Sequence, residues 1–457
     1  AEPLPPPGSA ACAVVAPADP MPMLGAGGCS TVSCHGGPPA GNHDVTTFAA
    51  TLWAARDPHA GAFQTLHEPR SLRMAALLGI GAPHRARQCL ACHSVQAESA
   101  SPLPPAVLAD GVACSSCHGD ATRWAAIHTL PSWKQLGPAA RAELGYRSLS
   151  DATARVRTCI PCHVGDESRE VDHDLVAAGH PRLAFEFAAY ERLWPRHWSP
   201  RGAAESQPDF SARSWAVGQA EMLAAVAGLL ATRAERAAAA SDAVEESDAV
   251  HDEPAVTHWP EFAEFDCYAC HRALSPERVA HGAGGTFRNP TPGMPSWQPW
   301  SVAAARLLSA AVADPATAAA SARAADLRDA FGNRWAASDR EHLARVAMRA
   351  RALEAAAFAA SREIAARRVV VLDASAERLD GLVAAEPDAW RFWDAAAQTC
   401  LLLEAAAQPS PSATVRELRV DLRFPPGIGG PDRFDPEAFE QARRAASYRS
   451  EEHTSEL

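Results

Sequence analysis

Paired cysteines followed at once by a histidine recur along the chain and give its clearest chemical signal. Four copies have the spacing C-x-x-C-H: CLACH (Cys89, Cys92, His93), CSSCH (Cys114, Cys117, His118), CIPCH (Cys159, Cys162, His163) and CYACH (Cys267, Cys270, His271). The composition of the chain predicts about 0.01 such copies by chance. The repeated spacing therefore indicates one shared chemistry.

That chemistry is the covalent attachment of c-type haem. Two cysteines three positions apart can form thioether bonds to both vinyl groups of the macrocycle, and the next histidine can bind the iron. A zinc site would use paired cysteines but does not need a histidine after every pair. A thioredoxin-like dithiol would show one C-x-x-C in a βαβ setting. The regular motifs therefore predict haem, with His93, His118, His163 and His271 as proximal ligands.

The first motif along the chain, CSTVSCHGG, has two extra residues between Cys29 and Cys34, and His35 follows directly. These residues can bulge outward while both sulfurs still reach the vinyl groups. Gly36 follows His35 as Gly119 follows His118. The alternative is a free dithiol in a loose leader. We expect a fifth site here, and thus five haem c groups per chain.

The second axial ligand of each iron decides between a carrier and a catalyst. An isolated histidine is usually a surface or hydrogen-bonded residue, so sequence context must select the candidates. His59 follows Pro58 at the apparent start of a helix, and His128 lies ten residues after His118. His173 and His180 are seven apart, which places them near one helical face if the segment is helical throughout.

The segments DPHAGAFQTL, CLACH, GVACSSCHGDATRWAAIH, CIPCH and VDHDLVAAGHPRLAFEF together resemble one known family. It is the family of multihaem c-type cytochromes related to the tetrahaem electron acceptor of hydroxylamine oxidoreductase. The resemblance covers about residues 25–300. It implies that His59 and His128 are distal ligands, with His180 or His173 as another. The tetrahaem relative has one five-coordinate haem, and the wide first motif, the fifth motif and the long C-terminal region depart from its pattern.

The expected fold class is mainly α, with a loop-rich multihaem domain followed by an Ala-rich helical region. Residues 1–24 form a Pro/Ala-rich leader that we expect to be disordered. Residues 25–300 form the pentahaem domain, in which macrocycles supply much of the apolar volume. Within it, the apolar spacing from Trp215 to Leu229 predicts a helix at about 211–237, and residues 238–256 form an acidic linker.

Residues 301–448 are predicted to form a helical domain that packs on the haem domain or on a partner. Ser338 and Glu341 match a capping box, and helical spacing of apolar residues continues from Leu343 to Ile364. Trp393 and the leucines after Cys400 suggest another helix, with Cys400 as a buried small hydrophobe. The tail RSEEHTSEL, residues 449–457, resembles a translated sequencing adapter; its alternative is an acidic polar tail.

The bulk properties limit location and partners. A formal charge of −12 argues against non-specific nucleic-acid binding. The longest strongly apolar window, MLAAVAGLLA, is too short for a bilayer, so we expect no transmembrane segment. Haem c is attached outside the cytoplasm, which predicts a periplasmic or otherwise extracytoplasmic protein. The first residue is Ala1, consistent with a removed signal peptide or a fragment.

Three function classes remain, and an electron carrier between a redox donor and a redox acceptor is favoured. The alternative is an oxidoreductase that acts on a small nitrogen or sulfur species at one open haem. Against it, the chain has no C-x-x-C-K motif, a signature of nitrite-reducing relatives, and only four tyrosines for a haem cross-link. A haem-bearing sensor or scaffold has no motif in its support.

Overall fold

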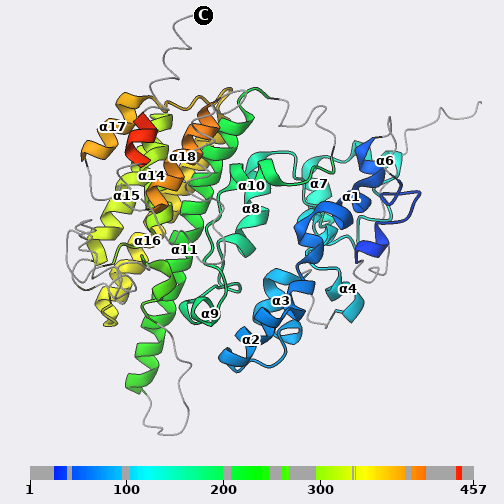
Figure 1. Cartoon of the computed structure of the whole chain (residues 1–457), viewed down its shortest axis with the longest axis horizontal. Helices are drawn as coiled ribbons and strands as arrows, with labels where there is room; N and C mark the ends of the chain where they lie inside the picture. Colours follow the sequence, from blue (N-terminus) through cyan, green and yellow to red (C-terminus); the bar gives the residue numbers. More distant parts are fainter. Residues whose placement is uncertain are drawn as a thin grey trace, which may run out of the picture. The chain divides into compact units, whose positions relative to one another are not determined.

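The computed structural model describes residues 25–38, 44–94, 103–198, 207–246, 259–266, 295–331, 334, 336–385, 393–407 and 439–444. Helices dominate these residues, which confirms the predicted mainly α class (Figure 1). The β-structure among these residues consists of the isolated bridges Asp166–Arg169 and Phe265–Trp297. The predicted leader, the fifth haem motif (Cys267, Cys270, His271) and the tail lie outside the described residues.

The chain divides into two compact units, which we describe separately. Unit 1 comprises Ala1–Leu72, Gly81–Asp151 and Pro195–Ser199. Unit 2 comprises Arg73–Ile80, Ala152–Trp194 and Pro200–Leu457. The predicted domain limits at residues 300 and 448 stay predictions.

Unit 1 is built from short helices and turns. Its helices are α1 (Ala49–Arg56), α3 (Arg87–His93), α4 (Pro105–Ala109), α5 (Cys114–His118), α6 (Pro131–Gln135) and α7 (Pro138–Glu143). Its 3-10 turns are η1 (Ala26–Gly28), η2 (Val45–Phe48), η3 (Pro58–Gly61), η4 (Gln64–His67) and η5 (Pro83–Arg85), while α2 (Pro69–Leu78) crosses the unit boundary. Its buried apolar cluster consists of Ala26 and Ala113, with three partly buried side chains against them. Other buried apolar side chains of unit 1, such as Phe63, Leu66 and Trp133, lie outside this cluster, so the described core of unit 1 is not continuous.

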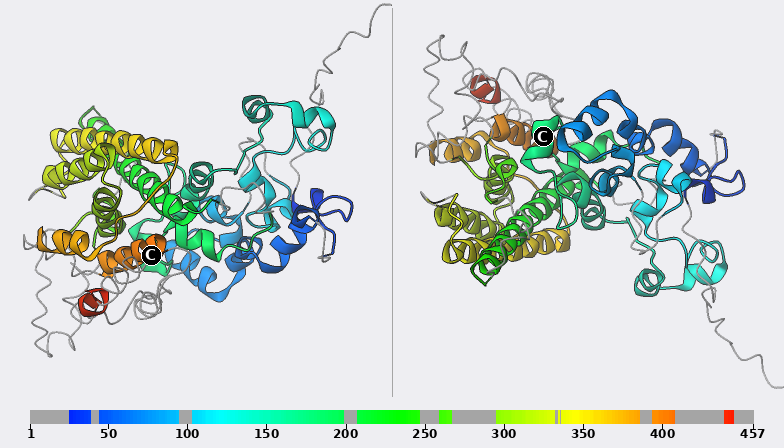
Figure 2. Two further views of the ribbon diagram at one scale, coloured as in Figure 1. Left: turned by 90° about the horizontal axis from the view of Figure 1, so that it is seen from above. Right: turned by 90° about the horizontal axis from the view of Figure 1, so that it is seen from below.

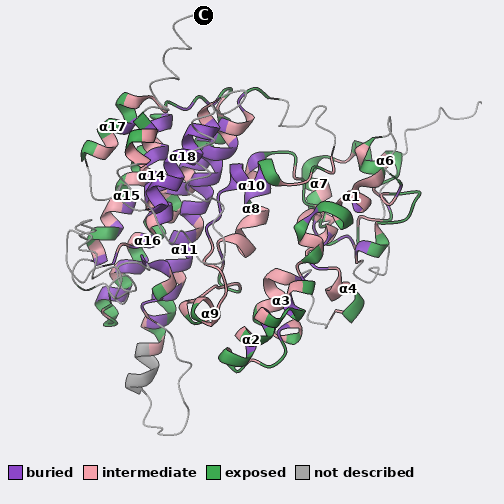
Figure 3. Cartoon of the chain, in the orientation of Figure 1, coloured by how far each residue is buried: buried purple, intermediate pink, exposed green. Residues whose placement is uncertain are grey.

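Unit 2 is a helical bundle with an extensive core. It contains α8 (Ala152–His163), α9 (His173–Ala178), α10 (Phe187–Leu193), α11 (Phe210–Glu246), η7 (Phe262–Glu264), α14 (Pro299–Val312), α15 (Pro315–Phe331), α16 (Arg340–Ala366), α17 (Ala376–Ala385) and α18 (Trp393–Ala406). The long helices α11 and α16 run side by side (Figure 2). Buried residues gather on α11, α14 and α18 (Figure 3).

Helix α11 covers the predicted helical segment and extends beyond it. Trp215 is fully buried, and Met222 and Leu223 are nearly so. The stretch Phe210–Ala240 is long and apolar enough to cross a membrane by length and composition, although 83% of its apolar window is buried inside the protein. The short-window argument against a membrane span therefore does not hold for this helix. Its burial is what the core helix of a soluble protein shows, so the helix is weak evidence for a span.

Helix α16 begins one residue later than the predicted capping box requires. The carboxylate of Asp339, not the Ser338 hydroxyl, accepts the cap hydrogen bond from the His342 N–H, at 3.1 Å. An aspartate at this position also places negative charge at the positive end of the helix dipole. Behind it, the predicted face from Leu343 to Ile364 is buried.

Ion pairs to buried carboxylates fix α8 within the bundle. Arg155 on α8 donates to the carboxylate of Glu191 on α10 at 2.5 Å, and both side chains are almost inaccessible to solvent. Arg157 donates two hydrogen bonds, of 2.9 and 2.8 Å, to Glu221 on α11. Glu221 also accepts a hydrogen bond from the Ser361 hydroxyl on α16. The helix that bears the fourth motif is therefore held by carboxylates from two other helices, α10 and α11, one of which is also bonded to α16.

Glu186 makes the stability of unit 2 depend on pH. Its carboxylate accepts hydrogen bonds from the Ala188 and Ala189 N–H groups at the start of α10, at 3.0 and 2.7 Å. The side chain is buried, and this burial raises its pKa to about 7, against the opposing influence of Arg192. Because the folded pKa exceeds the unfolded one, the folded state holds this proton more tightly. The contribution to stability is present at about pH 4 and is lost as the pH rises to about 7.

When the pH is raised from about 5 to about 8, we therefore expect the free energy of unfolding to fall less in Glu186→Gln than in the wild type. The difference should be on the order of 2–3 kcal/mol. Thermal unfolding followed by far-UV circular dichroism at several pH values measures it. Glu341→Gln, at an exposed carboxylate of α16, is the matched control and should follow the wild type. A constant offset between Glu186→Gln and the wild type at every pH would contradict the prediction.

Candidate haem sites

Three of the motifs occupy the last turn of a helix. Helices α3, α5 and α8 each end at the motif histidine, at His93, His118 and His163. Helical residues three and four apart lie on the same face. Both sulfurs and the imidazole of each motif are therefore placed along one side of the helix, as attachment to one macrocycle requires.

The wide first motif closes as a loop instead of a helix. The His35 N–H donates to the Cys29 carbonyl at 3.2 Å, and the Cys34 N–H donates to the Thr31 carbonyl at 2.9 Å. A Cβ atom on Gly36 would lie 1.8 Å from the Ser30 carbonyl oxygen, so only glycine fits behind His35. The two extra residues are thus accommodated between the cysteines.

Glycine after the third motif has a similar steric reason. Gly119 has φ +84°, and a Cβ atom there would lie 2.1 Å from the Gly145 carbonyl oxygen. The Arg147 N–H donates to the His118 carbonyl at 2.9 Å. The end of α5 is therefore packed tightly against residues 145–147.

The first and third motifs are in contact within unit 1. A hydrogen bond between the Cys29 and Cys114 sulfur groups lowers the pKa of Cys29 to about 7 and raises the pKa of Cys114. Burial, together with the nearby His197, His35 and Arg147, lowers the pKa of His118 to about 4. His118 is therefore neutral at pH 7, the state in which imidazole binds a metal.

Five candidate ligands have their rings oriented through Nδ1. Four of these atoms are hydrogen-bonded to backbone carbonyls: His35 to Thr46 at 2.6 Å, His93 to Ala62 at 2.9 Å, His128 to Ala125 at 2.5 Å and His180 to Pro181 at 2.8 Å. In His59, Nδ1 bonds the Asp57 carboxylate at 2.8 Å. A proton held on Nδ1 leaves the lone pair on Nε2, the arrangement found in metal-binding histidines. These residues therefore fit iron ligation.

Two pairs of histidine rings have the separation that a shared iron requires. The ring centres of His35 and His128 are 6.2 Å apart with 19° between their planes, and those of His118 and His197 are 6.4 Å apart with 77°. Metal–nitrogen bonds of about 2 Å place two imidazole centres on opposite sides of one iron about 6 Å apart. His128 was predicted from the sequence. His197 was not, because its segment WPRHWSP has neither motif spacing nor helical periodicity.

The fourth motif borders a partly open pocket within unit 2. His163 lines it, and the Phe185 ring lies against that imidazole at 5.0 Å between centres. Met222 and Trp300 supply apolar walls from α11 and α14. These walls suit an apolar macrocycle.

Charged side chains also line this cavity. Arg182 donates to Asp394 at 2.7 Å, and Arg233 bonds Glu170 at 2.8 Å and also Glu264. Burial raises the pKa of Glu264, while Arg233 opposes that shift. The guanidinium groups therefore add positive charge at the cavity wall, balanced by buried carboxylates.

His173 and His180 do not share a helical face. Helix α9 spans His173–Ala178 and ends at Gly179, whose φ of +124° an L side chain rarely adopts. His180 lies beyond the helix, so the condition on which their pairing rested is not met. His173 starts the helix, where its N–H donates to Glu261 at 2.8 Å.

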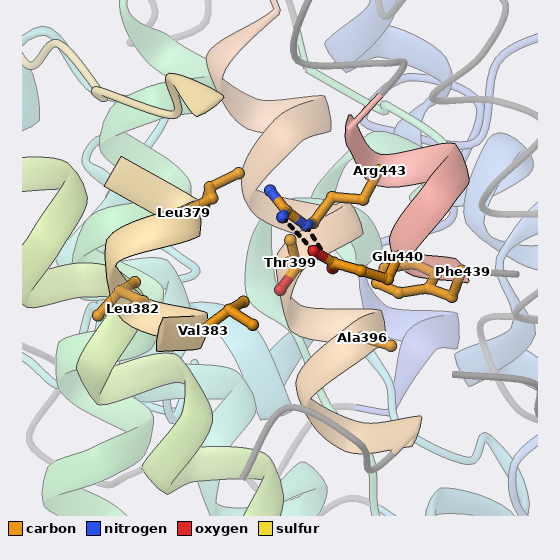
Figure 4. A pocket seen from close by; sticks show the side chains of 8 residues that line it. All are labelled: Leu379, Leu382, Val383, Ala396, Thr399, Phe439, Glu440 and Arg443. Atoms are coloured by element: carbon orange, nitrogen blue, oxygen red, sulfur yellow. Dashed lines mark hydrogen bonds and ion pairs between the residues drawn. The ribbon is translucent and has the colours of Figure 1, made fainter. Parts of the chain in front are cut away.

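A second hollow, between α17, α18 and residues 439–444, is not a haem candidate (Figure 4). Its lining includes Leu379, Thr399 and Arg443, and Arg443 bonds Glu440 at 2.5 and 2.8 Å. The residues that line it include neither cysteine nor histidine. It therefore offers no group for thioether attachment or iron ligation.

Comparison with known proteins bears on the first three motifs. Residues 28–119 match the family described as cytochrome c554 and c-prime. No curated protein and no solved structure matches the chain. The matched segment contains three of the attachment motifs described above. The match over residues 28–119 supports a c-type cytochrome segment with haem c as the cofactor and electron transfer as the role.

Proposed function

We propose that the chain is an extracytoplasmic pentahaem cytochrome that carries electrons between a redox donor and a redox acceptor. The observation that carries the proposal is the spacing of two histidine pairs for two-sided ligation of iron. The attachment residues are the five motif cysteine pairs, including Cys267 and Cys270. His35, His93, His118, His163 and His271 are the proximal ligands.

Bound haem c supplies a one-electron change at iron. Two imidazoles on one iron favour a low-spin state whose geometry changes little on reduction. In this chain, carbonyl groups hold the Nδ1 atoms of His35 and His128 and so fix the ring orientation. His35 and His128 serve the first haem, and His59, with His180 or His173, supplies ligands to others.

The contact between Cys29 and Cys114 supports a close pair formed by the first and third haems. Thioether sulfurs in contact would bring the edges of two macrocycles together, which favours transfer between them. The net charge of −12 supports a basic redox partner, attracted by long-range electrostatics.

A catalytic role at the fourth haem is the second candidate. Among the described residues that line the pocket at the fourth motif, His163 is the one histidine. An iron there without a second imidazole would leave a position for a small nitrogen or sulfur species. The arginines at the wall would favour an anion.

Quantitative electron paramagnetic resonance of the oxidised holoprotein separates the two candidates. Intact mass and the pyridine haemochrome assay first count the haems, and we expect five per chain. Essentially no high-spin ferric signal supports the carrier. One high-spin haem per chain that shifts on addition of nitrite, hydroxylamine or nitric oxide supports the catalyst. A purified chain without covalently bound haem would overturn both.

A further inference from the structure

A short segment around His197 belongs to unit 1 although the chain on both sides belongs to unit 2. Pro195–Ser199 is assigned to unit 1, between Ala152–Trp194 and the stretch from Pro200 onward in unit 2. Of its described residues, Arg196 is exposed and the others are half-buried. What this segment brings to unit 1 is the imidazole of His197, beside His118.

The two rings are placed for a shared iron. Their centres are 6.4 Å apart, against the value of about 6 Å expected for imidazoles on opposite sides of one iron. The Trp198 ring packs edge to face on His197, with 5.1 Å between centres and 84° between planes. This packing limits rotation of the His197 ring.

The Tyr146 ring also lies 6.4 Å from that of His118, but its geometry does not suit ligation. A phenolate bound opposite His118 would place the ring centres about 7 Å apart, because the oxygen projects from the ring. Tyr146 instead packs edge to face against Trp124 and Trp133, at 5.2 and 5.4 Å. It belongs to an aromatic cluster beside the site.

We propose that His197 is the second axial ligand of the iron at the third motif, opposite His118. The assignment rests on the proposed function and adds a ligand that neither the motif spacing nor the family resemblance supplies. It also predicts different electronic structures for the iron of the first haem and the iron of the third haem. The imidazole planes are 77° apart at the third haem and 19° apart at the first. Crossed planes leave two iron d orbitals nearly degenerate, whereas parallel planes split them.

The holoprotein should therefore show two kinds of low-spin ferric signal. A highly anisotropic signal with a large maximum g value belongs to the third haem, and a rhombic signal belongs to the first. In His197→Ala, we expect an unchanged haem count, loss of the anisotropic signal of one haem and the gain of one high-spin haem per chain. Added imidazole should restore the low-spin state, and the reduced variant should bind one additional carbon monoxide per chain.

Matched variants test the assignment. His84→Ala replaces another partly buried histidine of unit 1, stacked on His67 at 4.4 Å, and should keep the wild-type spectrum. His197→Met should keep the third haem low-spin, raise its potential and add a methionine–iron charge-transfer band. This second variant retains a ligand if His197→Ala does not fold.

A wild-type spectrum in both His197 variants would overturn the inference. Loss of the anisotropic signal in His173→Ala or His180→Ala, with His197→Ala unchanged, would overturn it in favour of those residues. Failure of the proposed function gives a different result, since the wild type would then lack haem or low-spin signals altogether.

Discussion

Replacing Cys114 and Cys117 with serine is expected to remove one haem per chain and to destabilise unit 1. Serine cannot form the thioether bonds, so the third haem has no covalent attachment. The described part of unit 1 has a very small apolar cluster, centred on Ala26 and Ala113. A macrocycle that supplies missing core volume couples its binding to folding, as metals do in small domains.

Intact mass gives the readout, with a decrease of one haem per chain, and limited proteolysis should then cut within residues 44–151. The increased susceptibility to proteolysis should extend to the segment around Cys29, because Cys29 is in contact with Cys114. Cys400→Ala is the matched control, since Cys400 is buried in α18 and lies outside every motif. It should keep the full haem count. If the double variant carried as many covalently bound haems as the wild type, the attachment role of Cys114 and Cys117 would be refuted.

Arg155→Ala is expected to cost about 3–5 kcal/mol in the free energy of unfolding of unit 2. The Arg155 and Glu191 side chains are 6% and 2% exposed, so the substitution leaves a buried carboxylate without its guanidinium. Removal of one member of a buried ion pair costs more than the pair contributes. Because α8 carries Cys159, Cys162 and His163, its loosening should also reduce occupancy of the fourth haem.

Chemical denaturation followed by far-UV circular dichroism measures the change. Arg323→Ala is the control, because its ion pair with Asp326 on α15 is exposed and should contribute less than about 1 kcal/mol. The double variant Arg155→Met with Glu191→Leu should recover much of the lost stability, since it leaves no buried charge. Similar losses in Arg155→Ala and Arg323→Ala would contradict this account.

The sequence could predict what depends on nearby residues. The C-x-x-C-H spacing specifies attachment groups on one side of a helix turn, and apolar periodicity specifies the buried faces of α11 and α16. Two predictions from local sequence were wrong, namely the N-cap residue of α16 and the helical continuity between His173 and His180. Asp339 competed with Ser338 for the cap of α16, and Gly179 ended α9 before His180.

Features that depend on distant parts of the chain could not be predicted. No local spacing brings His35 to His128 or His118 to His197, because each pair joins segments far apart in sequence. The contact between Cys29 and Cys114 joins motifs that are not consecutive. The pocket at His163 is lined by residues of α11 and α14. Most of α14 falls in the helical region from residue 301 onward, for which the sequence predicted no chemical role.

The two units exchange short segments along the chain. Arg73–Ile80 belongs to unit 2 although its neighbours belong to unit 1, and Pro195–Ser199 does the reverse. No single cut of the polypeptide can release either unit intact. A fragment that ends at Asp151 would retain the first three motifs and lose His197. The two units are therefore not independent modules that can be exchanged one at a time. A chimera with another cytochrome, joined at a single position, would leave one unit incomplete.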